Sequence, residues 1–127
     1  MFDHVGLRVR DLAQSTRFFQ RALEPLGHGL LSEGSGYAGF GPRGPGGAPA
    51  LWLHEHAPPA GTVAVGVHLA FVAPSREAVQ RFHAAGLEAG ARDNGAPGLR
   101  RDYGETYYAA FLIDGEGNNV EAVCVEA

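Results

Sequence analysis

The amino-acid sequence predicts an α+β fold in which two tandem βαβββ modules form a cupped mixed sheet around a central cavity. Three observations support this prediction: an internal repeat, an alternating strand at the start of each repeat, and an amphipathic helix after each of those strands. A shift of 64 positions aligns His4 with His68 and Leu23 with Leu87 without a gap. This half-length duplication indicates two copies of one unit, because a solenoid needs three or more repeats.

The first module is expected over residues 1–56. Its opening strand, at 2–9, alternates, so that apolar residues share one face and His4 lies on the other. A helix begins after Asp11, where Gln14 three residues later completes a capping-box pattern. Three short strands complete the module, at 28–33, 36–41 and 50–55, and are separated by turn-forming segments.

The second module is expected over residues 63–127 and repeats this order. Its first strand, at 65–72, also alternates, with His68 on the face opposite the apolar residues. The second helix starts near Ser75 and ends at Gly90. Three short strands then follow, at 91–94, 107–114 and 118–124.

Two connections matter for the domain organisation. His56 to Thr62, which contains two adjacent prolines, is the expected joint between the modules. The segment from Asp93 to Thr106 is long and rich in glycine, which is typical of a surface loop or of a lid over a pocket. Because the chain is short enough for one core, residues 1–127 are expected to form a single domain.

Composition excludes several classes of function. The net charge is −4 and there is no basic run, so neither nucleic acid nor a membrane surface is an expected partner. All ten basic residues are arginine, which rules out chemistry that depends on a lysine. No apolar stretch approaches the roughly 20 residues that span a bilayer, and no secretion signal is evident. With Cys124 as the single cysteine, a cytoplasmic protein is expected.

Three residues could form a metal centre. His4 and His68 occupy equivalent positions in the duplication, so a pseudo-twofold arrangement of the modules would make them face each other across the cavity. Glu121 stands among apolar residues in the last strand, where a carboxylate is costly to bury unless something pairs with it. Two imidazoles and one carboxylate with open positions suit a divalent first-row metal. Each histidine taken alone is also compatible with a hydrogen-bonded structural role.

The sequence resembles the vicinal oxygen chelate superfamily, which includes glyoxalase I, extradiol dioxygenases, fosfomycin-resistance transferases and bleomycin-binding proteins. The resemblance lies in Asp3-His4-Val5, in the segment 68–71 and in the segment 114–121, and it extends over essentially the whole chain. It implies that His4, His68 and Glu121 bind one divalent ion, either Fe, Mn, Ni, Co or Zn. It also implies a small-molecule substrate that the metal binds through vicinal oxygens.

The sequence departs from known enzymes of this superfamily at positions that bear on which reaction it could catalyse. Glyoxalase I enzymes supply a fourth, glutamate ligand, but alignment of the strand at 50–55 with the last strand puts Trp52 in that position. Glyoxalase I activity is therefore not expected, unless His54 on the same face replaces the missing base. Fosfomycin transferases share the Leu-Trp-Leu strand, yet Ala109 and Phe111 stand where their phosphonate-binding serine and tyrosine belong.

The leading functional hypothesis is a metal-dependent lyase, isomerase or dioxygenase of the glyoxalase/dioxygenase type. A non-catalytic drug-binding protein of the bleomycin-resistance type and a fosfomycin-type thiol transferase remain alternatives. Glu121 and His54 are the candidate catalytic groups, and the candidate substrate-binding residues are Arg8, Trp52, Tyr103 and Tyr107. A homodimer is expected because each half leaves sheet edges unpaired. The modules could pair within one chain or by exchange between two chains.

Overall fold

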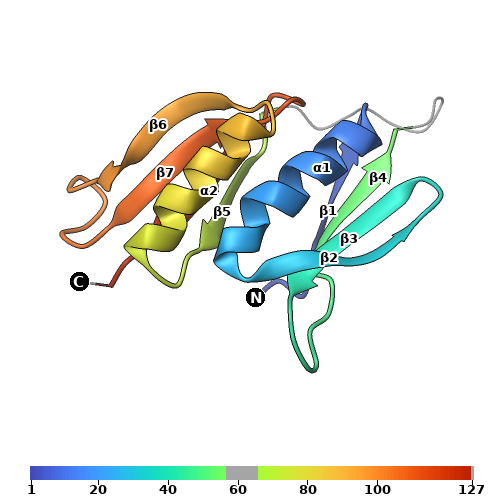
Figure 1. The fold of residues 1–127 in the computed structure, drawn as a ribbon, viewed down its shortest axis with the longest axis horizontal. Helices are drawn as coiled ribbons and strands as arrows, with labels where there is room; N and C mark the ends of the chain where they lie inside the picture. The colour runs from blue at the N-terminus through green and yellow to red at the C-terminus, as the bar shows by residue number, and fades with distance from the viewer. Residues whose placement is uncertain (57–65, 127) are drawn as a thin grey trace.

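Two four-stranded mixed sheets, each covered by one helix, make up the computed structural model of the chain (Figure 1). The structure describes residues 1–56 and 66–126. The predicted joint between the modules, His56 to Thr62, therefore lies outside the described residues except for His56 itself.

The first module has the predicted βαβββ order, with strand order β1-β4-β3-β2 in the sheet. Its elements are β1 (Val5–Val9), α1 (Leu12–Leu23), a short 3-10 helix η1 (Glu24–Leu26), β2 (His28–Gly34), β3 (Tyr37–Pro42) and β4 (Leu51–Glu55). Strand β1 runs parallel to β4, and the other pairs are antiparallel. The Asp11 side chain accepts a hydrogen bond from the Gln14 amide at 3.0 Å, which confirms the predicted helix start.

The second module repeats this topology, with strand order β5-β8-β7-β6. Its elements are β5 (His68–Val72), α2 (Arg76–Glu88), β6 (Arg92–Leu99), β7 (Tyr108–Ile113) and β8 (Asn119–Cys124). Ser75 caps α2 through the Ala78 amide, and Gly90 follows the helix with a φ of 98°. The duplication read from the sequence is thus a structural duplication.

Three predicted strands differ in length: β1 and β5 each begin three residues later than predicted, at Val5 and His68, and β6 differs most. Strand β6 continues to Leu99, whereas the sequence suggested a strand at 91–94 and a loop from Asp93 onward. Its glycine and proline content is accommodated because the pairing with β7 shifts register twice, on either side of Gly95. The loop proper, between β6 and β7, is correspondingly shorter than predicted.

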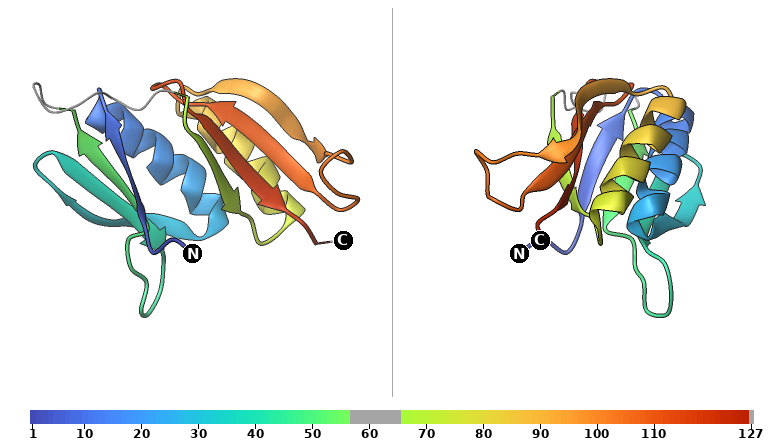
Figure 2. Two further views of the ribbon diagram at one scale, coloured as in Figure 1. Left: turned by 180° about the vertical axis from the view of Figure 1, so that it is seen from behind. Right: turned by 60° about the vertical axis from the view of Figure 1, so that its left-hand side comes forward.

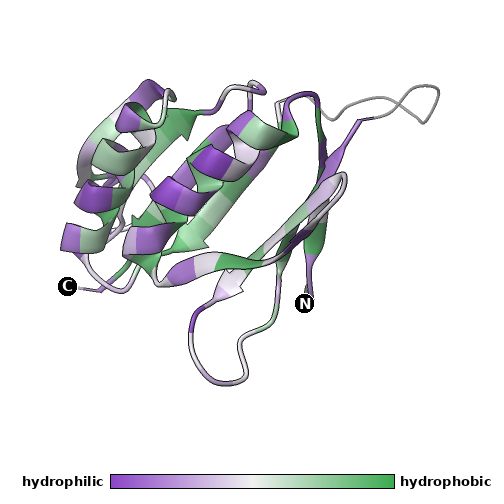
Figure 3. Ribbon diagram, turned by 45° about the vertical axis from the view of Figure 1, so that its right-hand side comes forward, coloured by the Kyte–Doolittle hydropathy of each residue, from purple (hydrophilic) through white to green (hydrophobic). Residues whose placement is uncertain are grey.

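The core lies between the helices and the inner faces of the sheets. The two helices lie side by side on the same side of both sheets, as the views from the front and from behind show (Figures 1 and 2). Their outward faces are hydrophilic (Figure 3). Phe19 and Phe82 are fully buried, and the ring of Phe19 on α1 reaches across to Phe71 on β5, 6.5 Å between centroids. Both outer sheet faces are therefore left free of helices.

A polar contact also joins the modules. Glu116, in the turn between β7 and β8, is 7% exposed, and its carboxylate accepts hydrogen bonds from the Arg10 amide at 2.8 Å and the Asp11 amide at 3.1 Å. Asp114 holds this turn by accepting from the Glu116 and Asn118 amides. The acidic turn of the second module thus docks onto the start of α1 in the first.

Candidate functional site

The second sheet carries a buried carboxylate on its outer face. Glu121, in the middle of β8, is 3% exposed. The Tyr107 hydroxyl donates to its carboxylate, at 2.9 Å to Oε2 and 3.2 Å to Oε1. Nε2 of His68, on the neighbouring edge strand β5, lies 4.0 Å from Oε2. These two side chains are the polar partners that the structure gives this carboxylate among the described residues, as its burial requires.

Tyr107 is fixed as a hydrogen-bond donor. Burial, together with the hydrogen bond to Glu121, raises the pKa of Tyr107 to about 12, so the hydroxyl keeps its proton at neutral pH. The Tyr103 ring packs edge-on against it, 5.3 Å between centroids. The pocket in front of these groups has a volume of about 380 Å³ and is lined by His68, Ala70, Tyr103, Tyr107, Phe111, Asn119 and Glu121.

The first sheet carries a different kind of pocket on its outer face. Its volume is about 540 Å³, and it is lined by His4, Gly6, Ser32, Tyr37, Trp52 and His54. The Trp52 and His54 rings are close to parallel, 23° between planes and 6.5 Å between centroids. Nδ1 of His4 is 2.6 Å from the Asp3 carboxylate, so Nε2 is the ring nitrogen that remains for another ligand.

Strand register places Trp52 and Glu121 at equivalent positions. Trp52 pairs with Gly6 of β1, and Glu121 pairs with Ala70 of β5, which is the residue 64 positions after Gly6. The sequence alignment that put Trp52 in the acidic position is therefore supported by the structure. The first module offers an aromatic ring where the second offers a carboxylate.

The structure does not bring the three predicted metal ligands together within one chain. His68 and Glu121 border the pocket of the second sheet, whereas His4 borders the pocket of the first. No group of three histidine, cysteine or acidic side chains in the described ranges could hold a metal ion. The expectation that His4 and His68 face each other across one cavity is thus not met within a single chain, and the ligand set stays a prediction.

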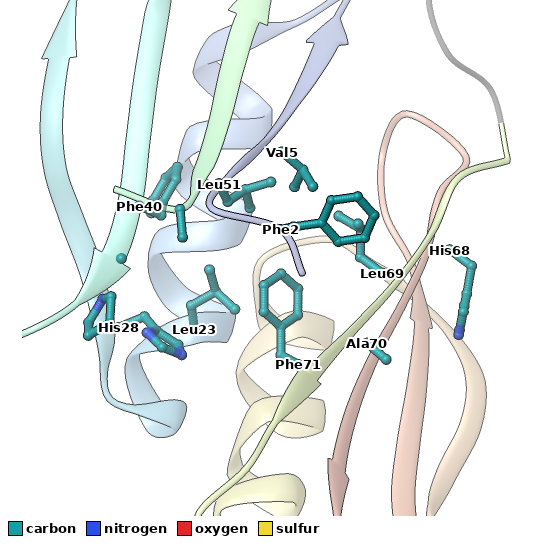
Figure 4. Close-up of a pocket in the computed structure, with 13 residues that line it drawn as sticks. Phe2, Val5, Leu23, His28, Phe40, Leu51, His68, Leu69, Ala70 and Phe71 are labelled. Carbon is teal, nitrogen blue, oxygen red and sulfur yellow. The ribbon is translucent and has the colours of Figure 1, made fainter. Parts of the chain in front are cut away.

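An apolar groove of about 360 Å³ separates the two edge strands β1 and β5. Phe2, Val5 and Leu51 line it from the first module, and Leu69 and Phe71 line it from the second (Figure 4). Figure 4 also shows the alternation of β5, since His68 lies on the other side of this strand from Leu69 and Phe71. Strands β1 and β5 lie on either side of the groove and belong to separate sheets, so they do not pair with each other.

Arg8 is the remaining candidate substrate-binding residue, and His83 has a structural role. Arg8 is exposed on the outer face of β1, in register with His54, but outside the two sets of pocket-lining residues among those described. His83 is structural, since its Nε2 lies 2.9 Å from the Asp93 carboxylate and joins α2 to β6. Hydrogen bonds from the Gly95 amide and from His83 lower the pKa of Asp93.

Sequence reasoning missed Tyr37 and Ser32 in the first pocket and Phe111 in the second. Alternation along β3 was the available signal for Tyr37, because it shares a face with Gly39 while Ala38 and Phe40 are buried on the other face. Ser32 gave no such signal, because the pairing of β2 with β3 shifts register just before it.

Comparison with known proteins decides the family. The profile of the Glyoxalase/Bleomycin resistance protein/Dioxygenase superfamily matches residues 1–122. The chain belongs to this superfamily. A solved glyoxalase/bleomycin resistance protein from Albidiferax ferrireducens T118 is 31% identical, with 98% of each chain covered and a TM-score of 0.74. A search of curated protein sequences found no match.

The superfamily fold is shared by more distant structures. A glyoxalase/bleomycin resistance protein/dioxygenase family enzyme from Burkholderia phytofirmans PsJN is similar over 98% of both chains, at 22% identity and a TM-score of 0.72. At that identity the likeness supports the fold alone. Within the described residues, neither helix has the length and apolar character needed to cross a membrane.

Proposed function

We propose that this superfamily member is a divalent-metal-dependent enzyme of the glyoxalase/dioxygenase type, acting on a small molecule with vicinal oxygens. The observation that carries the proposal is the buried Glu121 carboxylate with the His68 imidazole 4.0 Å away on the next strand. A buried charged carboxylate is unfavourable unless it is paired, and a metal ion bound beside the Tyr107 hydrogen bond would compensate further for its burial.

These two donors fit a first-row divalent ion. Imidazole nitrogen and carboxylate oxygen bind Zn²⁺ and related ions at about 2.0–2.2 Å, so two ligands of one ion lie at most about 4.2 Å apart. The separation of 4.0 Å between Nε2 of His68 and Oε2 of Glu121 falls within this limit. A tetrahedral or octahedral site would require side-chain rotation that brings the two atoms closer than this. Two ligands alone are too few, however, for a stable site.

We infer that His4 of the partner subunit supplies the third ligand in a homodimer. Strands β1 and β5 are both sheet edges, and an unpaired edge is a template for pairing with another chain. A second copy that sets its β1 beside β5 brings its own first-module pocket to the Glu121 pocket. The pseudo-twofold relation of the modules then makes two such composite sites per dimer.

The chain's own residues have distinct roles in such a site. His68, Glu121 and the partner's His4 would hold the ion, which supplies Lewis-acid polarisation of substrate oxygens when bound. Tyr107 orients Glu121 through its hydroxyl. His54, exposed beside Trp52, is the candidate proton-transfer side chain of the first pocket. Trp52 adds bulk where glyoxalase I has a fourth ligand.

Complementation between two inactive chains tests the composite site. His4→Ala and His68→Ala chains, each with its own affinity tag, are co-expressed, the doubly tagged heterodimer is purified, and its metal content is measured after reconstitution with Fe, Mn, Ni, Co or Zn. One of its two sites keeps all three ligands, so we expect one ion per heterodimer, two per wild-type dimer and none in either homodimer of variants.

Three other results would contradict the proposal. A metal-free heterodimer with metal-loaded wild type would mean that the site is not shared between chains. Equal metal content in wild type and Glu121→Ala would remove this residue from the ligand set. Wild type that takes up none of the metals, yet binds small molecules, would favour the sequestering function of a bleomycin-resistance type of protein.

A further inference from the structure

We infer that the outer face of the first sheet is a binding floor for a flat aromatic ring of a small molecule. The inference deepens the proposed function and rests on it in one respect, namely that this face forms one wall of the composite site. The floor is defined by Tyr37, Trp52 and His54, whose rings lie over the strands of the first sheet.

Glycines let two of these rings lie down on the sheet. A Cβ atom added at Gly39 would lie 2.6–3.0 Å from the six-membered ring of Trp52, so the indole occupies the space that any larger residue on β3 would need. A Cβ atom at Gly34 would likewise lie 2.6 Å from the phenol ring of Tyr37. Gly39 is directly opposite Trp52 and Gly34 is directly opposite Tyr37 in the strand pairing. Both rings are therefore in contact with the sheet, and both residues border the pocket.

The arrangement of the rings selects the shape of the ligand. The planes of Trp52 and His54 differ by only 23° and their centroids are 6.5 Å apart, so the two rings are nearly parallel neighbours on the same face of β4. Tyr37 adjoins Trp52 at 6.1 Å with a tilt of 56°. An aromatic box that surrounds a quaternary ammonium ion needs rings on several sides, whereas an indole that lies against a sheet, as Trp52 does over Gly39, favours stacking of a planar ring on its other face.

The two pockets divide the recognition of such a ligand. The first pocket has a volume of about 540 Å³, which suits one small molecule. Ser32 borders the same pocket, and its hydroxyl can bond to a polar substituent of the ring. The charged group, Glu121, lies in the other pocket, so the floor itself presents no carboxylate to the ring.

The test compares a planar with a saturated probe on metal-free protein. Binding of 2-naphthol and of decahydro-2-naphthol is measured by calorimetry after removal of metal with a chelator. Stacking on two rings should make 2-naphthol bind about tenfold tighter, although the saturated probe is the more hydrophobic one. Trp52 is the only tryptophan, so its fluorescence quenching by acrylamide independently reports whether the floor is open to solvent in the dimer.

Variants of two glycines test whether 2-naphthol binds on the Trp52 ring. Gly39→Ala lifts the indole off the sheet and should abolish the roughly tenfold preference for 2-naphthol. Gly29→Ala is the matched control, because it lies in the same sheet and displaces only the flexible Arg43 side chain, so the preference should persist. If Gly39→Ala does not fold, judged by circular dichroism, Trp52→Leu replaces it and should have the same effect.

Four results would overturn the inference: equal or tighter binding of the saturated probe, stronger binding of tetramethylammonium than of 2-naphthol, an unchanged preference in the folded Gly39→Ala or Trp52→Leu protein, and a Trp52 that the partner subunit shields from acrylamide. Metal content is measured in separate samples. Loss of the metal site with retained aromatic preference therefore contradicts the proposed function alone, and the reverse result contradicts this inference alone.

Discussion

The contact between Glu116 and the start of α1 yields a prediction about how the two modules stay together. The Glu116 carboxylate, which is 7% exposed, accepts two backbone hydrogen bonds across the module boundary, from Arg10 at 2.8 Å and Asp11 at 3.1 Å. The Arg10 guanidinium is 3.8 Å away and about half exposed, so this ion pair contributes little beyond the backbone contacts. Glu116→Ala removes both acceptors and leaves two amides of a part-buried segment without a partner.

The expected loss of stability follows from these two bonds. A hydrogen bond to a charged group contributes about 1.5–3 kcal/mol, so the lower bound for the pair is about 3 kcal/mol. For a domain of this size, about 1 kcal/mol shifts the melting temperature by roughly 3–5 °C, and the variant should melt about 10 °C below wild type. Glu116→Gln keeps one acceptor oxygen, so its melting temperature should lie between those of wild type and Glu116→Ala.

Urea unfolding followed by Trp52 fluorescence and by far-ultraviolet circular dichroism measures this effect. Glu105→Ala is the matched control, since it removes an exposed carboxylate from the loop between β6 and β7 and should change the unfolding free energy by less than about 0.5 kcal/mol. Equal midpoints for Glu116→Ala and Glu105→Ala would refute the reasoning. If the unfolding curves from Trp52 fluorescence and from circular dichroism no longer coincide in Glu116→Ala, the modules unfold independently once the contact is lost.

Two further predictions concern single side chains. The pKa of Asp93 lies below its usual 3.8 because the Gly95 amide and His83 bond to the ionised form, so its stabilising contribution is present above that pH and is lost as the pH falls through the lowered pKa. The stability difference between wild type and Asp93→Asn should therefore shrink between about pH 5 and about pH 2, and a constant difference in urea midpoints would contradict it. Tyr107→Phe removes the hydrogen bond to Glu121 and should weaken metal affinity about 10–100-fold without abolishing it. Metal titration of the two proteins measures this, and equal affinities would rule out the orienting role.

Periodicity predicted most of the fold, because the outer and inner faces of strands alternate in the sequence itself. The apolar face of β1 and the capping of α1 by Asp11 both follow from residues that are near each other in the chain. Strand β6 could not be predicted in full, because its register shifts around Gly95 depend on pairing with β7. The same holds for Glu116, whose partners are 105 and 106 positions away.

For the candidate site, sequence reasoning predicted where single residues lie in their strands better than which residues lie close together in space. The pairing of His68 with Glu121 follows from the adjacent strands β5 and β8, and the structure brings the two together. The grouping with His4 depends on how two modules pack, and helix-to-helix packing within the chain leaves His4 on a separate sheet. No local sequence pattern encodes how the two modules pack, because this packing joins residues that are far apart in the chain.

The two modules carry different residues at equivalent positions of their outer sheet faces. Trp52 faces Gly39 in the first sheet, and the matching pair in the second sheet is Glu121 with Phe111. The aromatic ring of this pair thus stands on β4 in the first module and on β7 in the second, where its partner on β8 is a carboxylate. The pocket of the second module therefore combines a carboxylate with the rings of Tyr107 and Phe111, whereas the pocket of the first has aromatic rings and no acidic lining residue among those described. The single chain keeps these two faces in separate pockets, and the proposed dimer would bring them together along the edges of β1 and β5.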